Sequence, residues 1–160
     1  MLIAEIVFLC ALFFLICYLN TGSDEKNIKS FASYPDEIQH IVRQYPTLNE
    51  KIKTTAPVVS FLSNVLMFGI IILVFGFFIK QENFVDNFIC LLILGQCLNA
   101  FDFLVIDMLW WRNSKRIRFT GTEDLQSVYR NSKKHFISFL KGILVFLMIA
   151  VMDGLILSFL

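Results

Sequence analysis

Residues 57–79 read PVVSFLSNVLMFGIIILVFGFFI and contain no charged side chain. A transmembrane helix needs about 20 mostly apolar residues, because it rises 1.5 Å per residue across a hydrocarbon layer ~30 Å thick. The whole chain of 160 residues is 57% hydrophobic and 17% charged and includes 18 Phe, whereas a soluble domain is roughly 45–50% apolar and about 25% charged. The composition excludes a disordered chain or a small disulfide scaffold and predicts a protein of the lipid bilayer.

Three other stretches are also long and apolar enough to cross a bilayer. The first of them has no Lys or Arg before Lys26 and no Ala-x-Ala-like site after its apolar core, so we expect a retained helix rather than a cleaved signal peptide. We therefore predict one all-α polytopic membrane domain over residues 1–160. Its four transmembrane helices are expected at about 2–19, 57–79, 84–110 and 136–160, joined by long segments at 20–56 and 111–135.

The basic residues are distributed very unequally between the connecting segments. Only Lys80 lies between the second and third predicted spans. The two long segments hold Lys26, Lys29, Arg43, Lys51 and Lys53, and Arg112, Lys115, Arg116, Arg118, Arg130, Lys133 and Lys134. The positive-inside rule places both long segments in the cytoplasm and both termini outside. We expect an integral protein of a bacterial cell membrane.

The long segments carry the patterns of amphipathic helices. Ile38, Ile41, Val42 and Tyr45 follow the i, i+3, i+4, i+7 spacing of one helix face, which Pro46 ends. A capping box at residues 47–50 predicts a second helix that continues into the span at 57, and a turn at 121–124 predicts a third that continues into the last span. These helices would lie on the inner leaflet or pack against the cytoplasmic ends of the spans.

Several polar residues lie inside the predicted spans. A charge deep in lipid costs on the order of 2.5–3.5 kcal/mol by insertion scales, so such residues usually face the interior of a helix bundle. At about 100° per residue, one arc of about 140° on the third span holds four polar side chains, Gln96, Asn99, Asp102 and Asp107. With Asn64 and Lys141 at similar depth, they predict a polar pocket open to the cytoplasm. Alternatively, these groups join the helices by hydrogen bonds.

The pocket suggests binding of an anionic lipid or amphiphile, and an enzyme and a binder both remain open. Asp102 or Asp107 would serve as general base if burial favours its neutral form. The predicted ligand-binding residues are Asn64, Gln96, Asn99, Arg112, Lys115, Arg116 and Lys141. The basic residues of segment 111–135 equally suit topology and attraction to lipid head groups.

Two alternatives belong to other functional classes. The first is a non-catalytic accessory or scaffold subunit, or a homo-oligomer, which would use small residues of the last span. Those residues are Ser138, Gly142, Ala150, Gly154 and Ser158. The second alternative is a transporter formed between protomers, with Asp102 or Asp153 as a proton or cation site.

Other kinds of chemistry have little support in the sequence. Cys10, Cys17, Cys90 and Cys97 form no C-x-x-C motif, and His40 and His135 have no metal-ligand spacing, so no metal site is predicted. The common nucleotide, hydrolase and zinc-protease motifs do not occur. The net charge of +1 gives no indication of nucleic-acid binding, and no cofactor follows from any motif.

Overall fold

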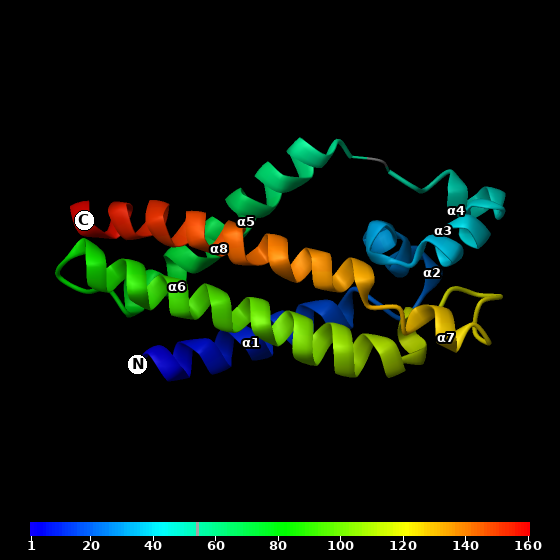
Figure 1. Ribbon diagram of the computed structural model, residues 1–160, viewed down its shortest axis with the longest axis horizontal. Helices are drawn as coiled ribbons and strands as arrows, with labels where there is room; N and C mark the ends of the chain where they lie inside the picture. The colour runs from blue at the N-terminus through cyan, green and yellow to red at the C-terminus, as the bar shows by residue number, and fades with distance from the viewer. Residues whose placement is uncertain (54) are drawn as a thin grey trace. The chain divides into compact units, whose positions relative to one another are not determined.

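The computed structural model describes residues 1–53 and 55–160, and the regular elements in that part of the chain are helices (Figure 1). Four helical stretches are long and apolar enough to cross a membrane, as predicted. They are α1 (Leu2–Leu19), α5 (Pro57–Phe78), the helix Phe84–Trp111, and the stretch Gln126–Phe159 that contains α8 (Lys133–Phe159).

The third of these helices changes its geometry part-way along. It begins as α6 (Phe84–Phe101) and continues as a π-helix, η2 (Asp102–Trp111). The i→i+5 hydrogen bonds of a π-helix turn the chain less per residue than those of an α-helix, and π-helical turns are frequent at functional sites. The α-helical angles used to place Asp102 and Asp107 on the face of Gln96 and Asn99 therefore do not apply beyond Phe101.

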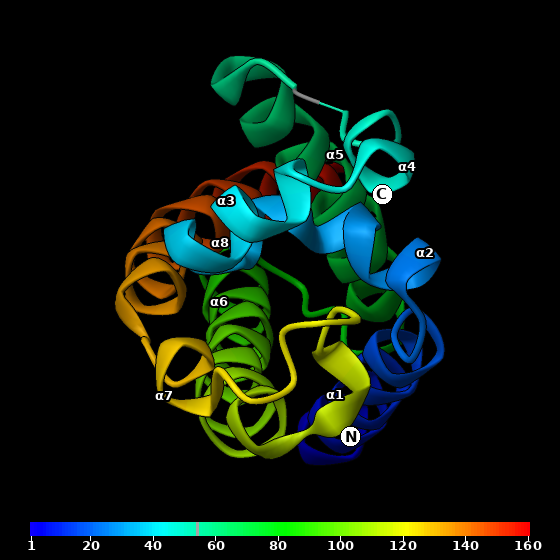
Figure 2. The same ribbon diagram turned by 90° about the vertical axis from the view of Figure 1, so that its right-hand side faces the viewer.

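Short helices occupy the two long connecting segments, and Figure 2 turns them toward the viewer. The predicted helix after residue 35 is confirmed as α3. The short elements are α2 (Asp24–Asn27), the 3₁₀-helix η1 (Ile28–Ser33), α3 (Asp36–Arg43), α4 (Pro46–Asn49), the 3₁₀-helix η3 (Lys115–Ile117) and α7 (Gln126–Tyr129).

Two predicted helix continuations are wrong. The helix near residue 47 ends at Asn49, and α5 starts separately with Pro57 in its first turn, where a missing N–H is tolerated. Likewise, α7 ends at Tyr129 and does not run into α8. The side chain of Asn131 accepts a hydrogen bond from the backbone N–H of Lys133 at 3.1 Å and so starts a new helix there.

Contacts group the chain into two compact units. Unit 1 comprises residues 1–11, 55–101 and 139–160, and unit 2 comprises residues 12–54 and 102–138. In unit 1, α6 and α8 pack closely at glycines. A Cβ built on Gly95 would lie 2.7 Å from the ring of Phe146, and one built on Gly154 would lie 3.3 Å from the backbone of Phe88. A Cβ built on Gly142 would meet the side chain of Asn99, so Gly142 and Gly154, considered above for an oligomer interface, both lie where α8 packs against α6 within the chain.

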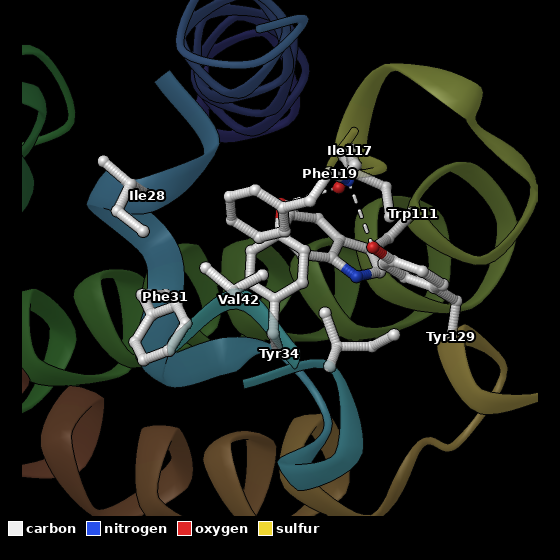
Figure 3. Close-up of a cluster of buried hydrophobic side chains, with 9 residues drawn as sticks. Ile28, Phe31, Tyr34, Val42, Trp111, Ile117, Phe119 and Tyr129 are labelled. Carbon is white, nitrogen blue, oxygen red and sulfur yellow. Dashed lines mark hydrogen bonds between the residues drawn. The ribbon is translucent and has the colours of Figure 1, made fainter. Parts of the chain in front are cut away.

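Unit 2 has an aromatic core to which both long segments contribute (Figure 3). Tyr34 lies at its centre, with ring centroids 5.0 Å from Trp111 and 4.8 Å from Phe119. Its hydroxyl donates to the backbone carbonyl of Ile117 at 2.8 Å. The core residues are Ile28, Phe31, Tyr34, Ile38 and Val42 from the first segment and Trp111, Ile117, Phe119 and Tyr129 from the second.

The buried face of α3 explains why this helix forms. Ile38 and Val42 are fully buried in the aromatic core, whereas Ile41 is half-buried and Tyr45 is exposed. The amphipathic pattern therefore reflects packing of α3 against the second long segment, and burial of its apolar stripe stabilises a helix too short to persist alone.

Candidate functional site

A buried acid–imidazole pair joins the end of the third long helix to the start of the fourth. In unit 2, the Nδ1 atom of His135 lies 2.8 Å from Oδ1 of Asp107. The side chains are only 7% and 13% exposed, respectively. The carboxylate holds the proton of the imidazole on Nδ1 and fixes the orientation of the ring. The two groups come from η2 and from the first turn of α8, which are distant in sequence.

The other ring nitrogen of the pair has no partner. Nε2 of His135 is buried without a hydrogen bond among the described residues, and so is Nε1 of Trp111, whose ring centroid lies 5.6 Å from that of His135. Buried polar atoms are nearly always hydrogen-bonded, so each such nitrogen requires an explanation. An indole N–H only donates, whereas Nε2 accepts when the imidazole is neutral and donates when it is protonated.

Asp102 is the first residue of η2 and is half-buried. No hydrogen bond or ion pair of the described chain engages its carboxylate. The described residues also hold no group of three or more His, Cys, Asp or Glu side chains arranged for a metal ion.

The predicted anion-binding arginines are engaged with the backbone. Arg116 donates to the carbonyls of Tyr18 at 3.2 Å and Thr21 at 3.0 Å, and its guanidinium stacks 4.0 Å from the ring centroid of Tyr18. Arg112 donates to the carbonyl of Arg130. These contacts engage carbonyl groups at or just beyond the ends of α1 and α7, where a helix leaves its last carbonyls without intrahelical partners. Lys115, in contrast, is exposed and has no ion pair in the described part of the chain.

Further cationic contacts hold the two long segments of unit 2 together. Lys134 pairs with Asp36 at 2.7 Å and donates to the carbonyl of Tyr34 at 2.8 Å. The ammonium group of Lys134 lowers the pKa of the Asp36 carboxyl below its ordinary value. The neutral side-chain amide of Asn27 also joins the segments, since it donates to the carbonyl of Arg116 at 3.0 Å. Several basic side chains of the second segment, those of Arg112, Arg116 and Lys134, are therefore engaged in contacts that stabilise unit 2.

The predicted ligand-binding residues of unit 1 divide into two groups. The side-chain amides of Gln96 and Asn99 on α6 donate to the carbonyls of Ile143 at 3.0 Å and Phe139 at 3.2 Å on α8. These bonds match the alternative in which polar groups join helices. Asn64 and Lys141 are exposed, and no hydrogen bond or ion pair of the described residues engages them.

Sequence reasoning missed His135 as a partner of Asp107. A signal was present, because both residues fall at the same predicted membrane boundary, one at the end of a span and one just before the next. Asp153, named in the sequence analysis as a possible proton or cation site, is buried inside unit 1.

No protein-family model, curated protein or solved structure matches the chain. The functional argument therefore rests on the geometry of these residues.

Proposed function

We propose that this chain is an integral membrane protein with both long segments in the cytoplasm, and that unit 2 binds an anionic amphiphile beside an acid–base pair formed by Asp107 and His135. The four apolar helices support the membrane location. Both long segments contribute to one aromatic core, which is the arrangement expected when they lie on the same side of the bilayer. The excess of basic residues in them favours the cytoplasmic side.

The observation that carries this proposal is the unpaired Nε2 of a histidine whose Nδ1 is held by a carboxylate. An imidazole oriented in this way is suited to accept a proton from a ligand or, when protonated, to hold an oxygen anion. In this assignment, His135 is the acid–base group, and Asp107 is a positioning residue that orients it and stabilises its charged form. This replaces the role of general base predicted for Asp107 itself.

Exposed cations in the second segment would supply the attraction for a negative group. Lys115, Arg130 and Lys133 are exposed and have no ion pair among the described residues. Each basic residue near an anionic membrane surface contributes about 1 kcal/mol of attraction. The hydrocarbon tail of an amphiphile would remain in the bilayer.

Native mass spectrometry of the protein in nanodiscs tests the proposal. The wild-type protein should retain phosphatidylglycerol in preference to phosphatidylcholine. A Lys115→Gln, Arg130→Gln, Lys133→Gln triple variant should lose that preference by on the order of a hundredfold, since it removes three charges that each contribute about 1 kcal/mol. Lys80→Gln, which removes an exposed cation of unit 1, is the matched control and should change nothing. Equal retention of both lipids by the wild-type protein would contradict the proposal.

A histidine variant separates the acid–base pair from the cationic surface. If His135 contacts the negative group, His135→Gln should weaken the retention of phosphatidylglycerol, and Asp107→Asn should weaken it as well, because the imidazole loses the carboxylate that orients it. His40→Gln, which replaces an exposed histidine of unit 2, is the matched control and should change nothing. Equal retention by the wild-type protein and His135→Gln would remove His135 from the site.

A second candidate function, a subunit of a membrane assembly, is favoured by one observation on α5. Asn64 is exposed with no hydrogen-bond partner in the described chain, although it lies seven residues into an apolar helix. An amide in hydrocarbon gains from hydrogen-bonding to another helix. Asn64→Leu should therefore weaken a homo-oligomer seen by native mass spectrometry, whereas Leu66→Ala on the same exposed helix should not. A monomeric wild-type protein would exclude self-assembly.

A further inference from the structure

Unit 1 contains one buried carboxyl group that the proposed function does not use. Asp153 on α8 is only 5% exposed, and its Oδ2 atom is buried without a hydrogen-bond partner among the described residues. Buried apolar side chains lie one turn away on either side, Ile149 and Ala150 before it and Leu157 after it. Asp153 therefore belongs to the apolar stripe with which α8 packs in its unit.

The surrounding helices pack tightly at this position. The next residue, Gly154, brings α8 against the backbone of Phe88 on α6, where an added Cβ would lie 3.3 Å from the Phe88 backbone. One turn further, Leu157 packs against Gly76 of α5, since a Cβ there would lie 2.9 Å from its side chain. The contacts shown next to Asp153 are therefore apolar side chains and backbone.

The other titratable groups of unit 1 provide no partner for this carboxyl group. They are the amino group of Met1, Glu5 and Cys10 on α1, Lys80 and Glu82 between α5 and α6, Asp86, Cys90 and Cys97 on α6, and Lys141 on α8. None forms a hydrogen bond or ion pair with Asp153 in the described structure. A metal cation would need several oxygen ligands, and the described residues hold no suitable group of three acidic, His or Cys side chains.

We propose that Asp153 is a proton-binding site inside the helix bundle, where its carboxylate takes up a proton from the aqueous phase before the exposed carboxylates of the protein do so as the pH falls. An ionised carboxylate buried without a partner is far less favourable than the neutral acid, so the group neutralises itself by binding a proton. Uptake of the proton forms one O–H bond and removes one negative charge from unit 1. This inference is independent of the lipid site proposed for unit 2.

Infrared spectroscopy of the protein in nanodiscs tests this inference. As the pH is lowered, the wild-type protein should show the C=O stretch of a protonated carboxyl group before its exposed carboxylates protonate, and Asp153→Asn should weaken that band. Asp86→Asn is the matched control, since Asp86 is an exposed carboxylate on α6 and its replacement should leave the band unchanged. A wild-type spectrum without such a band overturns the proposal, as does a band of undiminished intensity in folded Asp153→Asn.

Chemical labelling of the wild-type protein keeps the test valid if the variant fails to fold. A hydrophobic carbodiimide reacts with a neutral carboxyl group. The acid proton moves to a carbodiimide nitrogen while a carboxyl oxygen bonds to the central carbon and one C=N double bond becomes single, which gives an O-acylisourea. This product rearranges to a stable N-acylurea by moving the acyl group from oxygen to nitrogen. Peptide mass spectrometry should find this adduct on Asp153 at mildly acidic pH and much less of it at alkaline pH. Absence of an adduct on Asp153 at mildly acidic pH overturns the proposal.

Discussion

Unit 1 and unit 2 are held together by different means. In unit 1, long apolar helices approach each other at glycines, and the amides of Gln96 and Asn99 bond to carbonyls of α8. Many of its large apolar side chains are exposed. Unit 2 instead buries aromatic rings in a shared core and uses Asn27, Arg116 and Lys134 to satisfy backbone carbonyls.

The difference is of the kind expected between a hydrocarbon and an aqueous solvent. Between helices in lipid the hydrophobic effect provides no driving force, so close packing at small residues and hydrogen bonds hold the helices together. In water, burial of apolar surface is the dominant favourable term of folding. Unit 1 is built as expected for a hydrocarbon environment, and unit 2 is built as expected for an aqueous or interfacial one. Variants in the two units should therefore respond differently.

Tyr34→Ala is expected to have the largest effect on stability. It removes a fully buried ring and a hydrogen bond from the centre of the unit 2 core, which should cost about 3–5 kcal/mol of unfolding free energy. Denaturant titration in detergent, followed by the fluorescence of Trp110 and Trp111, would measure this loss. Tyr45→Ala is the control and should cost less than about 0.5 kcal/mol, because Tyr45 is exposed. Equal losses would mean that the aromatic core does not stabilise unit 2.

Among the variants of unit 1, Gly95→Leu should cause the largest loss of stability. The added side chain would meet the ring of Phe146 and separate α6 from α8, at a cost of about 1–3 kcal/mol. Thermal unfolding in detergent by circular dichroism would report it. Gly69→Leu on α5 is the matched control, since nothing lies within 4 Å of a Cβ at that position. If both variants unfold at the same temperature, close α6–α8 packing does not determine the stability of unit 1.

Asn99→Leu should lower the free energy of unfolding by less than Gly95→Leu does. It removes the bond from the side-chain amide to the carbonyl of Phe139, and such interhelical bonds contribute about 0.6 kcal/mol on average in membranes. The same unfolding assay would measure the loss. Asn64→Leu provides the comparison, because Asn64 has no partner in the described structure and its replacement should not destabilise the monomer. A loss above about 2 kcal/mol for Asn99→Leu would contradict the membrane-like behaviour inferred for unit 1.

The smallest expected effect is an alkaline pH dependence confined to unit 2. Burial raises the pKa of Tyr34 above its ordinary value of 10.0. The stability that the neutral phenol contributes is fully present below pH 10 and decreases as the pH rises further, because only the unfolded chain ionises there. Tyr34→Phe should flatten this alkaline decrease in tryptophan-detected unfolding, whereas Tyr45→Phe should leave it unchanged. If the stability of Tyr34→Phe decreases equally steeply above pH 10, the ionisation of a group other than Tyr34 causes the decrease.

Much of the fold could be predicted because hydrophobic length is a local property of the sequence. The run at residues 57–79 and the amphipathic spacing of Ile38 and Val42 each indicated a helix that the structure contains. The helix junctions near residues 50 and 130 were predicted wrongly, since a capping pattern does not reveal how far a helix extends. The π-helical geometry of Asp102–Trp111 was also missed, because periodicity arguments assume α-helical angles.

Less of the candidate site than of the fold could be predicted from the sequence, because the site is formed by contacts between residues that are far apart in the chain. Asp107 was selected because a carboxylate in an apolar span is unusual, but its partner His135 has no distinguishing sequence motif. The side chain of Arg116 was expected to bind an anion, whereas it bonds to the carbonyls of Tyr18 and Thr21. Sequence spacing does not indicate which backbone carbonyls a distant guanidinium will reach.

The amino-acid sequence by itself determined that this chain forms long apolar helices and that its basic residues gather in two segments, since both properties follow from composition along the chain. Only the tertiary structure decided that those segments share one aromatic core, that Asp107 meets His135, and that Asp153 is buried without a hydrogen-bond partner among residues 1–53 and 55–160. The physical reason is that hydrophobicity acts residue by residue, whereas hydrogen bonding and burial depend on which distant groups the fold brings together.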